Sequence, residues 1–355
     1  CASVYVKRPQ DVKKTGKYLF YSLPEDVIVV NLLIEETRFY KGPYADYAKD
    51  LLEIENVRKT NQISYSILKA EARNIRVPDK NNYYYYKGRC NKVTEKIITD
   101  RQNILYGISV NSPQMNCFPA FSYLKNSNYP VIPFADACND GTHKEVTDTT
   151  YKTSYIDSAF VKVPVLKTTL EAKTTADKAE DAANHLMRIR KRTFKFISGA
   201  YKEVPQPQTT ESILQELARE EAEYLSLFTG KEYSNQYIVS LQYTPGADTT
   251  HILAWFSEKA GLSAVQKPGY FPLVLELNYE GHLDTLKKYQ NFPDKKRING
   301  IVYRIPARIR VSLKMNNALI LQKDMLISQK GILSVYPASV VKKIKNGVVL
   351  HPVSE

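Results

Sequence analysis

The hydrophobic pattern of this 355-residue chain changes its period once and then changes back. Before about residue 174 and after about residue 230, short runs rich in Tyr, Val and Ile alternate with Pro and Gly turns, which is typical of β-strands. Between these positions, apolar residues recur every three or four residues, which is typical of amphipathic helices. We therefore expect an α+β fold that is mostly β, with its main helices in the middle of the chain.

The expected strands are short. Before the helical segment they are residues 18–21 and 26–30 with a turn at Pro24, then 62–76, 83–86, 103–110 and 155–165. After it they are residues 237–243, 250–256, 271–277, 300–313, 318–327 and 331–336. Pro306 places the strand that contains it at a sheet edge or at a bulge. The spacing of the later strands predicts a β-sandwich.

The helical segment is expected to form an antiparallel hairpin. One face of its first helix carries Ala179, Ala182, Leu186, Ile189, Thr193 and Ile197, and Gly199 ends it. The second helix is capped by Thr209 or Thr210, ends at Gly230, and points Ile213, Leu214, Leu217, Tyr224, Leu225 and Phe228 inward. The first helix carries Arg188, Arg190, Lys191 and Arg192, whereas the second helix is rich in Glu. Antiparallel pairing would place these opposite charges side by side.

Four segments follow from this pattern. Residues 1–16 are polar and basic and are expected to be a tether, and residues 17–173 an N-terminal β-rich domain. Residues 174–230 form the central antiparallel helical hairpin, and residues 231–355 form a C-terminal domain resembling a β-sandwich. A short helix is also expected just after Gly42-Pro43, since Pro is favoured at the first helical position.

The sequence begins with Cys1, followed by the small residues Ala2 and Ser3. In bacterial lipoproteins a signal peptide is removed directly before the cysteine that takes the lipid. We therefore expect a covalent lipid on Cys1, although a cloning or tag-cleavage product would look the same. The sequence contains no run of 18 apolar residues, the length needed to span a bilayer. The lipid would therefore attach the chain to the membrane.

The net charge of +13 does not indicate a nucleic-acid partner. The basic residues are spread along the chain, without zinc-finger spacing or an RNA-binding signature. Attraction to anionic lipid head groups or to acidic proteins is the better use of this charge.

No catalytic or metal-binding motif stands out, so we expect a protein that is not an enzyme and that holds no cofactor besides the lipid. The five His residues lack metal-site spacing, and Cys90, Cys117 and Cys138 form no C-x-x-C motif. One disulfide among these three cysteines is possible, with the pair undecided. Residues 136–141 resemble a calcium loop only faintly, and an ordinary turn explains them better.

Tyrosine is the unusual residue, with 26 copies. Four of them, Tyr83, Tyr84, Tyr85 and Tyr86, are consecutive and would face alternate sides of a strand. Tyr rings can stack on sugars or anchor a protein interface. The alternative is that they fill a half-buried sheet.

Several stretches together are similar to a known family. They are residues 39–52 (FYKGPYADYAKDLL), 148–165 (DTTYKTSYIDSAFVKVPV), the helical pair with Arg188, Lys191, Arg192 and residues 223–230 (EYLSLFTG), and 300–306 (GIVYRIP). From about Lys17 to Val340 the chain resembles an uncharacterised family, a domain of unknown function, from the envelope of Bacteroidota. Many members are predicted lipoproteins, and the family has no assigned catalytic residues. The resemblance implies export to the outer membrane, with the periplasmic face and the cell surface both open.

Three functions are compatible with these observations. The first is a non-enzymatic lipoprotein acting as an interaction or scaffold subunit of a larger envelope complex, such as one that assembles or exports outer-membrane proteins. The second is a glycan-binding lipoprotein of a nutrient-uptake system, which the Tyr run would serve. The third is an envelope hydrolase, for which Asp136, Asp140 and Cys138 are the first candidates.

Overall fold

The computed structural model describes residues 3–5, 18–87, 91–110, 134, 143–156, 159–200, 207–279 and 297–350. This part of the chain is mostly β, as the sequence predicts, with helices and several antiparallel sheets. It forms two compact units, each of which collects residues from distant parts of the sequence. Unit 1 comprises residues 1–36, 64–126 and 236–355, and unit 2 comprises residues 37–63 and 127–235.

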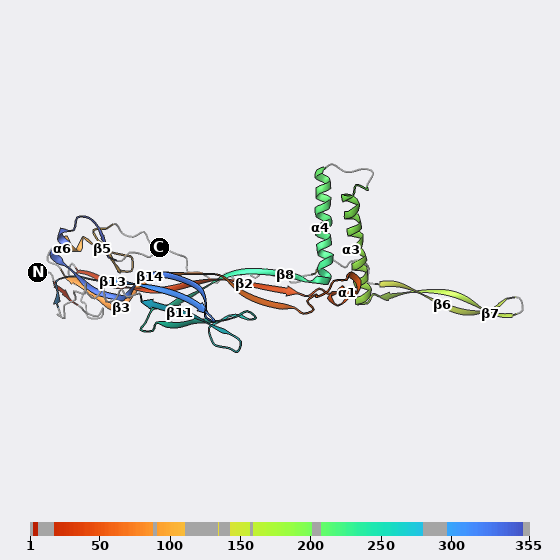
Figure 1. Cartoon of the computed structure of the whole chain (residues 1–355), viewed down its shortest axis with the longest axis horizontal. Coiled ribbons are helices and arrows are strands. Elements are labelled where there is room, and N and C mark those ends of the chain that lie inside the picture. Colours follow the sequence, from red (N-terminus) through yellow and green to blue (C-terminus); the bar gives the residue numbers. More distant parts are fainter. Residues whose placement is uncertain are drawn as a thin grey trace. The chain divides into compact units, whose positions relative to one another are not determined.

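The main strands of unit 1 belong to two five-stranded sheets. The first has the order β12-β1-β3-β2-β8, with β1 (Ser3–Tyr5), β2 (Tyr18–Tyr40), β3 (Gln62–Lys87), β8 (Lys231–Tyr243) and β12 (Arg297–Ile298). The second has the order β10-β9-β11-β13-β14, with β9 (Thr250–Ser257), β10 (Gly261–Ser263), β11 (Phe271–Tyr279), β13 (Gly300–Met315) and β14 (Ala318–Pro337). Figure 1 labels most of them.

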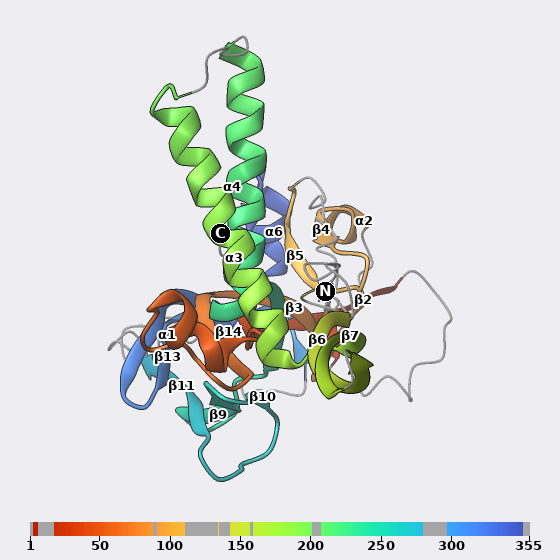
Figure 2. The same ribbon diagram turned by 90° about the vertical axis from the view of Figure 1, so that its right-hand side faces the viewer.

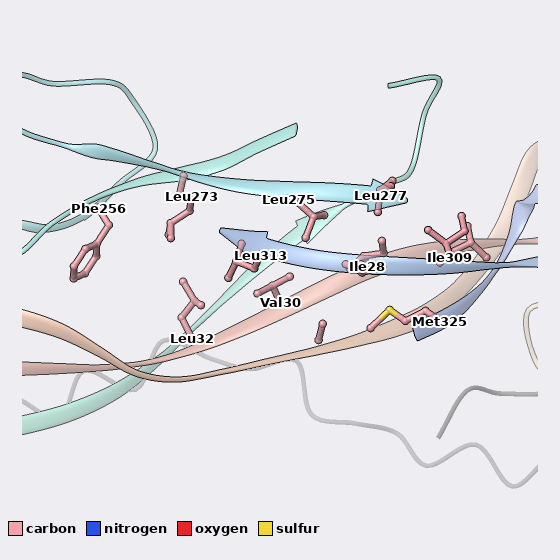
Figure 3. Packing of buried hydrophobic residues seen from close by; sticks show 14 of the residues in the cluster. Ile28, Val30, Leu32, Phe256, Leu273, Leu275, Leu277, Ile309, Leu313 and Met325 are labelled. Carbon is pink, nitrogen blue, oxygen red and sulfur yellow. The ribbon is translucent and has the colours of Figure 1, made fainter. Parts of the chain in front are cut away.

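The two sheets pack on each other through a shared hydrophobic core. Alternate residues of β2, including Ile28, Val30 and Leu32, are fully buried. Figure 3 shows them beside Leu273 of β11 and Leu313 of β13. This alternation is typical of a strand with one face on a core, and the arrangement is a β-sandwich.

A second core lies further along the same long strands. It contains Tyr21 and Leu23 from β2, Tyr86 from β3 and Val302 from β13. A three-stranded sheet and two short helices contribute to the rest of this part of unit 1. These elements are β4 (Ile97–Thr99), β5 (Leu105–Ile108), β15 (Val348–Val349), α2 (Asn91–Thr94) and α6 (Ala338–Lys343).

The strands are longer than the sequence suggests. The turn expected at Pro24 is wrong, because β2 continues through it, and the carbonyl oxygen of Pro24 accepts a hydrogen bond from Nη1 of Arg304 at 2.7 Å. β3 likewise joins two expected strands, as does β14. The strand expected at 155–165 is correct only from Ala159, since β6 ends at Ile156 and β7 begins at Ala159. Tertiary pairing overrides local strand breakers here.

The sequential domain layout also needs correction. The sandwich is not confined to residues 231–355, because one of its sheets contains β2 and β3 from the first part of the chain. The expected tether at 1–16 includes Ser3–Tyr5, which pair with both β3 and β12. Both corrections have the same cause: backbone pairing between residues far apart in sequence leaves no local signal.

The bulge at Pro306 is confirmed. The pairing of β13 with β14 shifts between Ile305, opposite Ile332, and Ala307, opposite Ile327. Residues 328–331 of β14 therefore have only Pro306 across from them. Since Pro has no N–H to donate, it is tolerated inside a sheet at such a bulge. Among the described residues β11 pairs with β13 only from Ile309 to Met315, so Pro306 lies beyond that pairing.

Unit 2 contains the helical hairpin and a two-stranded ribbon, together with a short helical turn. The elements are η2 (Ala45–Tyr47), α1 (Ala48–Leu52), β6 (His143–Ile156), β7 (Ala159–Ala172), α3 (Thr175–Ile197) and α4 (Pro207–Thr229). Figures 1 and 2 show α3 and α4 side by side. The expected hairpin and the short helix after Gly42-Pro43 are therefore present. No helix among the described residues is long and apolar enough to cross a membrane.

Candidate functional site

The tyrosine run proves to be mainly a core element. Tyr84 and Tyr86 are only 3% and 1% exposed and belong to the second core of unit 1. Tyr84 stacks on Tyr21, and Tyr83 stacks on Phe20 with ring centroids 5.3 Å apart. The buried pair cannot meet a ligand in this conformation. An interaction role for Tyr84 and Tyr86 is therefore contradicted, while Tyr83 and Tyr85 are half-buried.

Most of the other sequence candidates lie outside the described residues. This applies to Cys1, Cys90, Cys117, Cys138, residues 136–141, His282 and His351. Within the described part of the chain, no group of three or more His, Cys, Asp or Glu side chains is placed to hold a metal ion.

A buried polar cluster lies where the β14 bulge meets β2 in unit 1. The fully buried carboxylate of Asp26 accepts hydrogen bonds from the backbone N–H of Ser328 at 2.6 Å and from Nδ2 of Asn74 at 3.1 Å. The side-chain amide of Gln329 bonds to the backbone N–H and carbonyl oxygen of Asp26. Arg76 lies 3.8 Å from the carboxylate, and burial lowers the pKa of Arg76 despite that negative charge. These contacts fasten the bulge to the opposite sheet.

A second buried ion pair joins Arg304 of β13 to Asp79 of β3, with 2.6 Å between Nη2 and Oδ2. Burial disfavours the charged form of Asp79, but hydrogen bonds from Asn81 and Asn82 and the Arg304 guanidinium outweigh it. The pKa of Asp79 is therefore lower than usual. Like the Asp26 cluster, this pair is occupied by partners within the fold, which is the pattern of a structural network and not of a reactive site.

The base of the helical hairpin in unit 2 is well packed. Buried residues of α3, among them Ala179 and Ala182, contact Phe228 of α4 and Tyr44 near α1. No side chain fits at Gly42, because a Cβ there would collide with the carbonyl oxygen of Leu227. This close approach holds the chain before α1 against the end of α4.

Charged side chains fix the start and the pairing of α3. Thr174 and Asp177 form a capping box, in which each side chain accepts from the other residue's backbone N–H. The Lys144 ammonium of β6, 2.8 Å from Asp177, and the hydrogen bonds from Thr174 hold the pKa of Asp177 well below its usual range. Between the helices, Arg190 contacts Glu221 at 2.8 Å, so the expected pairing of opposite charges is present.

The outer end of α3 is exposed and apolar, in contrast to its base. The apolar face expected for this helix is buried from Ala179 to Ile189, but Ile197 is 73% exposed. Phe194 is 70% exposed, and Lys191 and Lys195 beside it are exposed too. Ile197 lies on the apolar face expected for this helix, and that face continues beyond the part of the helix that is covered. We call Phe194, Ile197 and their lysine neighbours Lys191 and Lys195 the α3 tip.

The tip is a candidate interaction surface because it combines one exposed aromatic ring and one exposed aliphatic side chain with positive charge. A partner that covers these large apolar side chains removes their surface from water, and this burial favours binding. Lysines at the rim favour a partner with an acidic border. Of the tip residues, only Ile197 belongs to the stripe that predicted the helix. Sequence reasoning missed Phe194 as a surface residue, and the sequence did not show that either side chain is exposed.

Comparison with known proteins identifies a family and no individual relative. The chain matches the family model described as Domain of unknown function (DUF4831) over residues 18–354. No curated protein and no solved structure matches it. The expectation of an uncharacterised family is thereby confirmed. The match covers nearly the entire chain, and this protein is a member of the DUF4831 family.

Proposed function

We propose that this chain is a non-enzymatic lipoprotein of the outer membrane of Bacteroidota, acting as an interaction or scaffold subunit of a larger envelope complex. A complex that assembles or exports outer-membrane proteins is one example. The observation that carries the proposal is the α3 tip, an exposed apolar and basic surface on a helix whose base is firmly packed.

The contrast between the two ends of the hairpin supports this role. The base is held by the capping box at Thr174, by Lys144 and by the buried alanines of α3. A helix fixed at one end presents its other end with little loss of conformational entropy on binding. Phe194 and Ile197 would supply the buried centre of such an interface, and Lys191 would supply its rim.

The proposed membrane attachment is a lipid on Cys1, and its support is the sequence alone. The residues directly after Cys1 are small, and the following segment is basic, which suits an anionic membrane surface. Mass measurement of the N-terminal peptide from the membrane fraction tests this part. A peptide with a lipid on Cys1 is expected, and an unmodified Cys1 would refute the anchor without affecting the α3 tip.

The interaction role is tested by purifying the full chain from native membranes in mild detergent. The double variant Phe194→Glu/Ile197→Glu should lose the partners that the wild type retains in fixed stoichiometry. Val265→Glu is the matched control, since it also puts a carboxylate on an exposed apolar residue, but in unit 1. Recovery of the wild-type chain alone, or equal loss of partners in the control, would contradict the proposal.

A further inference from the structure

The β6–β7 ribbon of unit 2 is a sheet of two strands, with fourteen residues in each. Among the described residues no third strand pairs with either edge. Tyr151, Leu166 and Leu170 lie on one face of the ribbon and are all at least 65% exposed. A two-stranded ribbon is only marginally stable in water by itself, and an unpaired edge is a template for another strand.

We propose that two copies of this chain associate through β6, whose outer edge pairs with the same edge of a second copy in antiparallel register. The result is a four-stranded sheet with the order β7-β6-β6-β7. This inference concerns the ribbon and does not depend on the α3 tip or on the lipid.

The two edges of the ribbon differ, and Pro164 makes the difference. Pro164 of β7 lies directly opposite Tyr151 of β6. Opposite residues in an antiparallel pair exchange either both backbone hydrogen bonds or none, and Pro has no N–H. The backbone groups of this pair therefore point outward, where Pro blunts the edge of β7. The edge of β6 contains no proline.

The same argument fixes which residues of β6 would pair. Since Tyr151 points its backbone groups outward, so do Thr147, Thr149 and Thr153, two and four residues away. An antiparallel pairing centred on Thr150 places Thr149 opposite Tyr151 and Thr147 opposite Thr153. Each of these pairs can exchange two backbone hydrogen bonds.

The charges of β6 are self-complementary in this register. With Thr150 at the centre, Asp148 of each copy lies opposite Lys152 of the other, so two ion pairs form. They occupy positions without backbone hydrogen bonds, where opposite side chains are closest. All the residues from Asp148 to Thr153 are exposed. Asp148 also lies opposite Lys167 of its own ribbon.

Neighbouring registers lack this match. A shift that centres the pairing on Asp148 sets two carboxylates against each other and Lys144 against Lys152. A shift that centres it on Lys152 opposes two lysines. The intermediate registers form no ion pair from Asp148 or Lys152. The register centred on Val146 would set Asp148 against Lys144, but Lys144 is already paired with Asp177 at 2.8 Å. Charge complementarity therefore favours a second copy as the partner, in the register centred on Thr150.

The first test compares Thr147→Pro with Thr168→Pro by sedimentation equilibrium of the full chain over a range of protein concentrations. Thr147 and Thr168 lie opposite each other, and both point their backbone groups outward, one on each edge. Proline at 147 removes a donor from the proposed interface, whereas proline at 168 adds a second block to the edge of β7. We expect a concentration-dependent dimer for the wild type and for Thr168→Pro, and a monomer for Thr147→Pro.

The second test uses charge. Lys152→Glu sets two pairs of carboxylates against each other across the interface and should raise the dimer dissociation constant about tenfold or more. Lys162→Glu is the matched control, because it makes the same change at an exposed lysine of β7. Asp148→Lys should also weaken its own dimer. An equal mixture of Lys152→Glu with Asp148→Lys restores both ion pairs, so it should dimerise as tightly as the wild type.

Three results would overturn the proposal. They are a wild type that stays monomeric at all concentrations, a dimer that Thr147→Pro leaves intact, and a mixture of the two charge variants that remains monomeric. Binding of a foreign extended peptide to a monomeric chain would also count against it, since the edge would then serve another partner.

Discussion

Replacing Asp26 by alanine is expected to destabilise unit 1 by about 3–5 kcal/mol, which is typical when one partner of a buried polar network is removed. The Asp26 carboxylate is fully buried and accepts from the Ser328 N–H and from Asn74, with Arg76 nearby. Alanine leaves the buried Ser328 N–H without its acceptor, at a cost of about 1–3 kcal/mol. The Arg76 guanidinium also loses the carboxylate that lies 3.8 Å away.

Two further variants separate the contribution of the negative charge from that of the hydrogen bonds, and a buried acid from a surface acid. Asp26→Asn keeps an oxygen for the Ser328 N–H but removes the negative charge, so it should cost less than alanine. Asp324→Ala removes an acid that pairs with Arg308 and Arg310 on the surface, where water replaces the lost contacts, and should change stability far less.

The assay is urea unfolding followed by the fluorescence of Trp255. This is the single Trp of the chain, and it lies in β9 of unit 1, so the signal reports on the unit that contains Asp26. The change should appear as a lower urea midpoint at unchanged slope. If Asp26→Ala shifts the midpoint no more than Asp324→Ala, the cluster does not fasten the β14 bulge as described.

Three further predictions concern other contacts. The pKa of Asp79 is lower in the folded chain than in the unfolded one. Its contribution to stability is therefore present at neutral pH and declines as the pH falls below about 4. Urea midpoints measured against pH should decline less steeply in acid for Asp79→Asn than for the wild type. Thr174→Ala removes the cap of α3 and should cost about 1 kcal/mol, visible as faster amide exchange in the first turn of α3. Gly42→Ala forces a Cβ onto the carbonyl oxygen of Leu227 and should lower the thermal midpoint of the chain. Gly246→Ala should lower it less, because the added Cβ there meets no atom within 4 Å.

The local elements were largely predictable from the sequence. The change of period at about 174 and 230 located the helical hairpin, because an amphipathic stripe is a property of contiguous residues. Pro306 correctly indicated a bulge, since Pro restricts hydrogen bonding wherever it occurs. A β-sandwich was expected within residues 231–355, but one of its two sheets contains β2 and β3 from the first part of the chain.

The partners of these elements were not predictable. Nothing local in β2 shows that it packs against β11 and β13, about 240 to 290 residues away along the sequence. The composition of the tyrosine run fits an exposed platform and a core strand equally well, and only packing against Tyr21 decided for the core. Ile197 continues the apolar face of α3, but it is exposed because it lies beyond the part of the helix that is packed against other residues.

Site-specific photo-crosslinking in native membranes tests the proposed function most directly. A photoreactive residue at Phe194 of the α3 tip should give a crosslink to one discrete envelope protein, which Ile197→Glu weakens. The same probe at Val265 should give none. Absence of any crosslink from Phe194, or the same products from both positions, would contradict an interaction role for this surface.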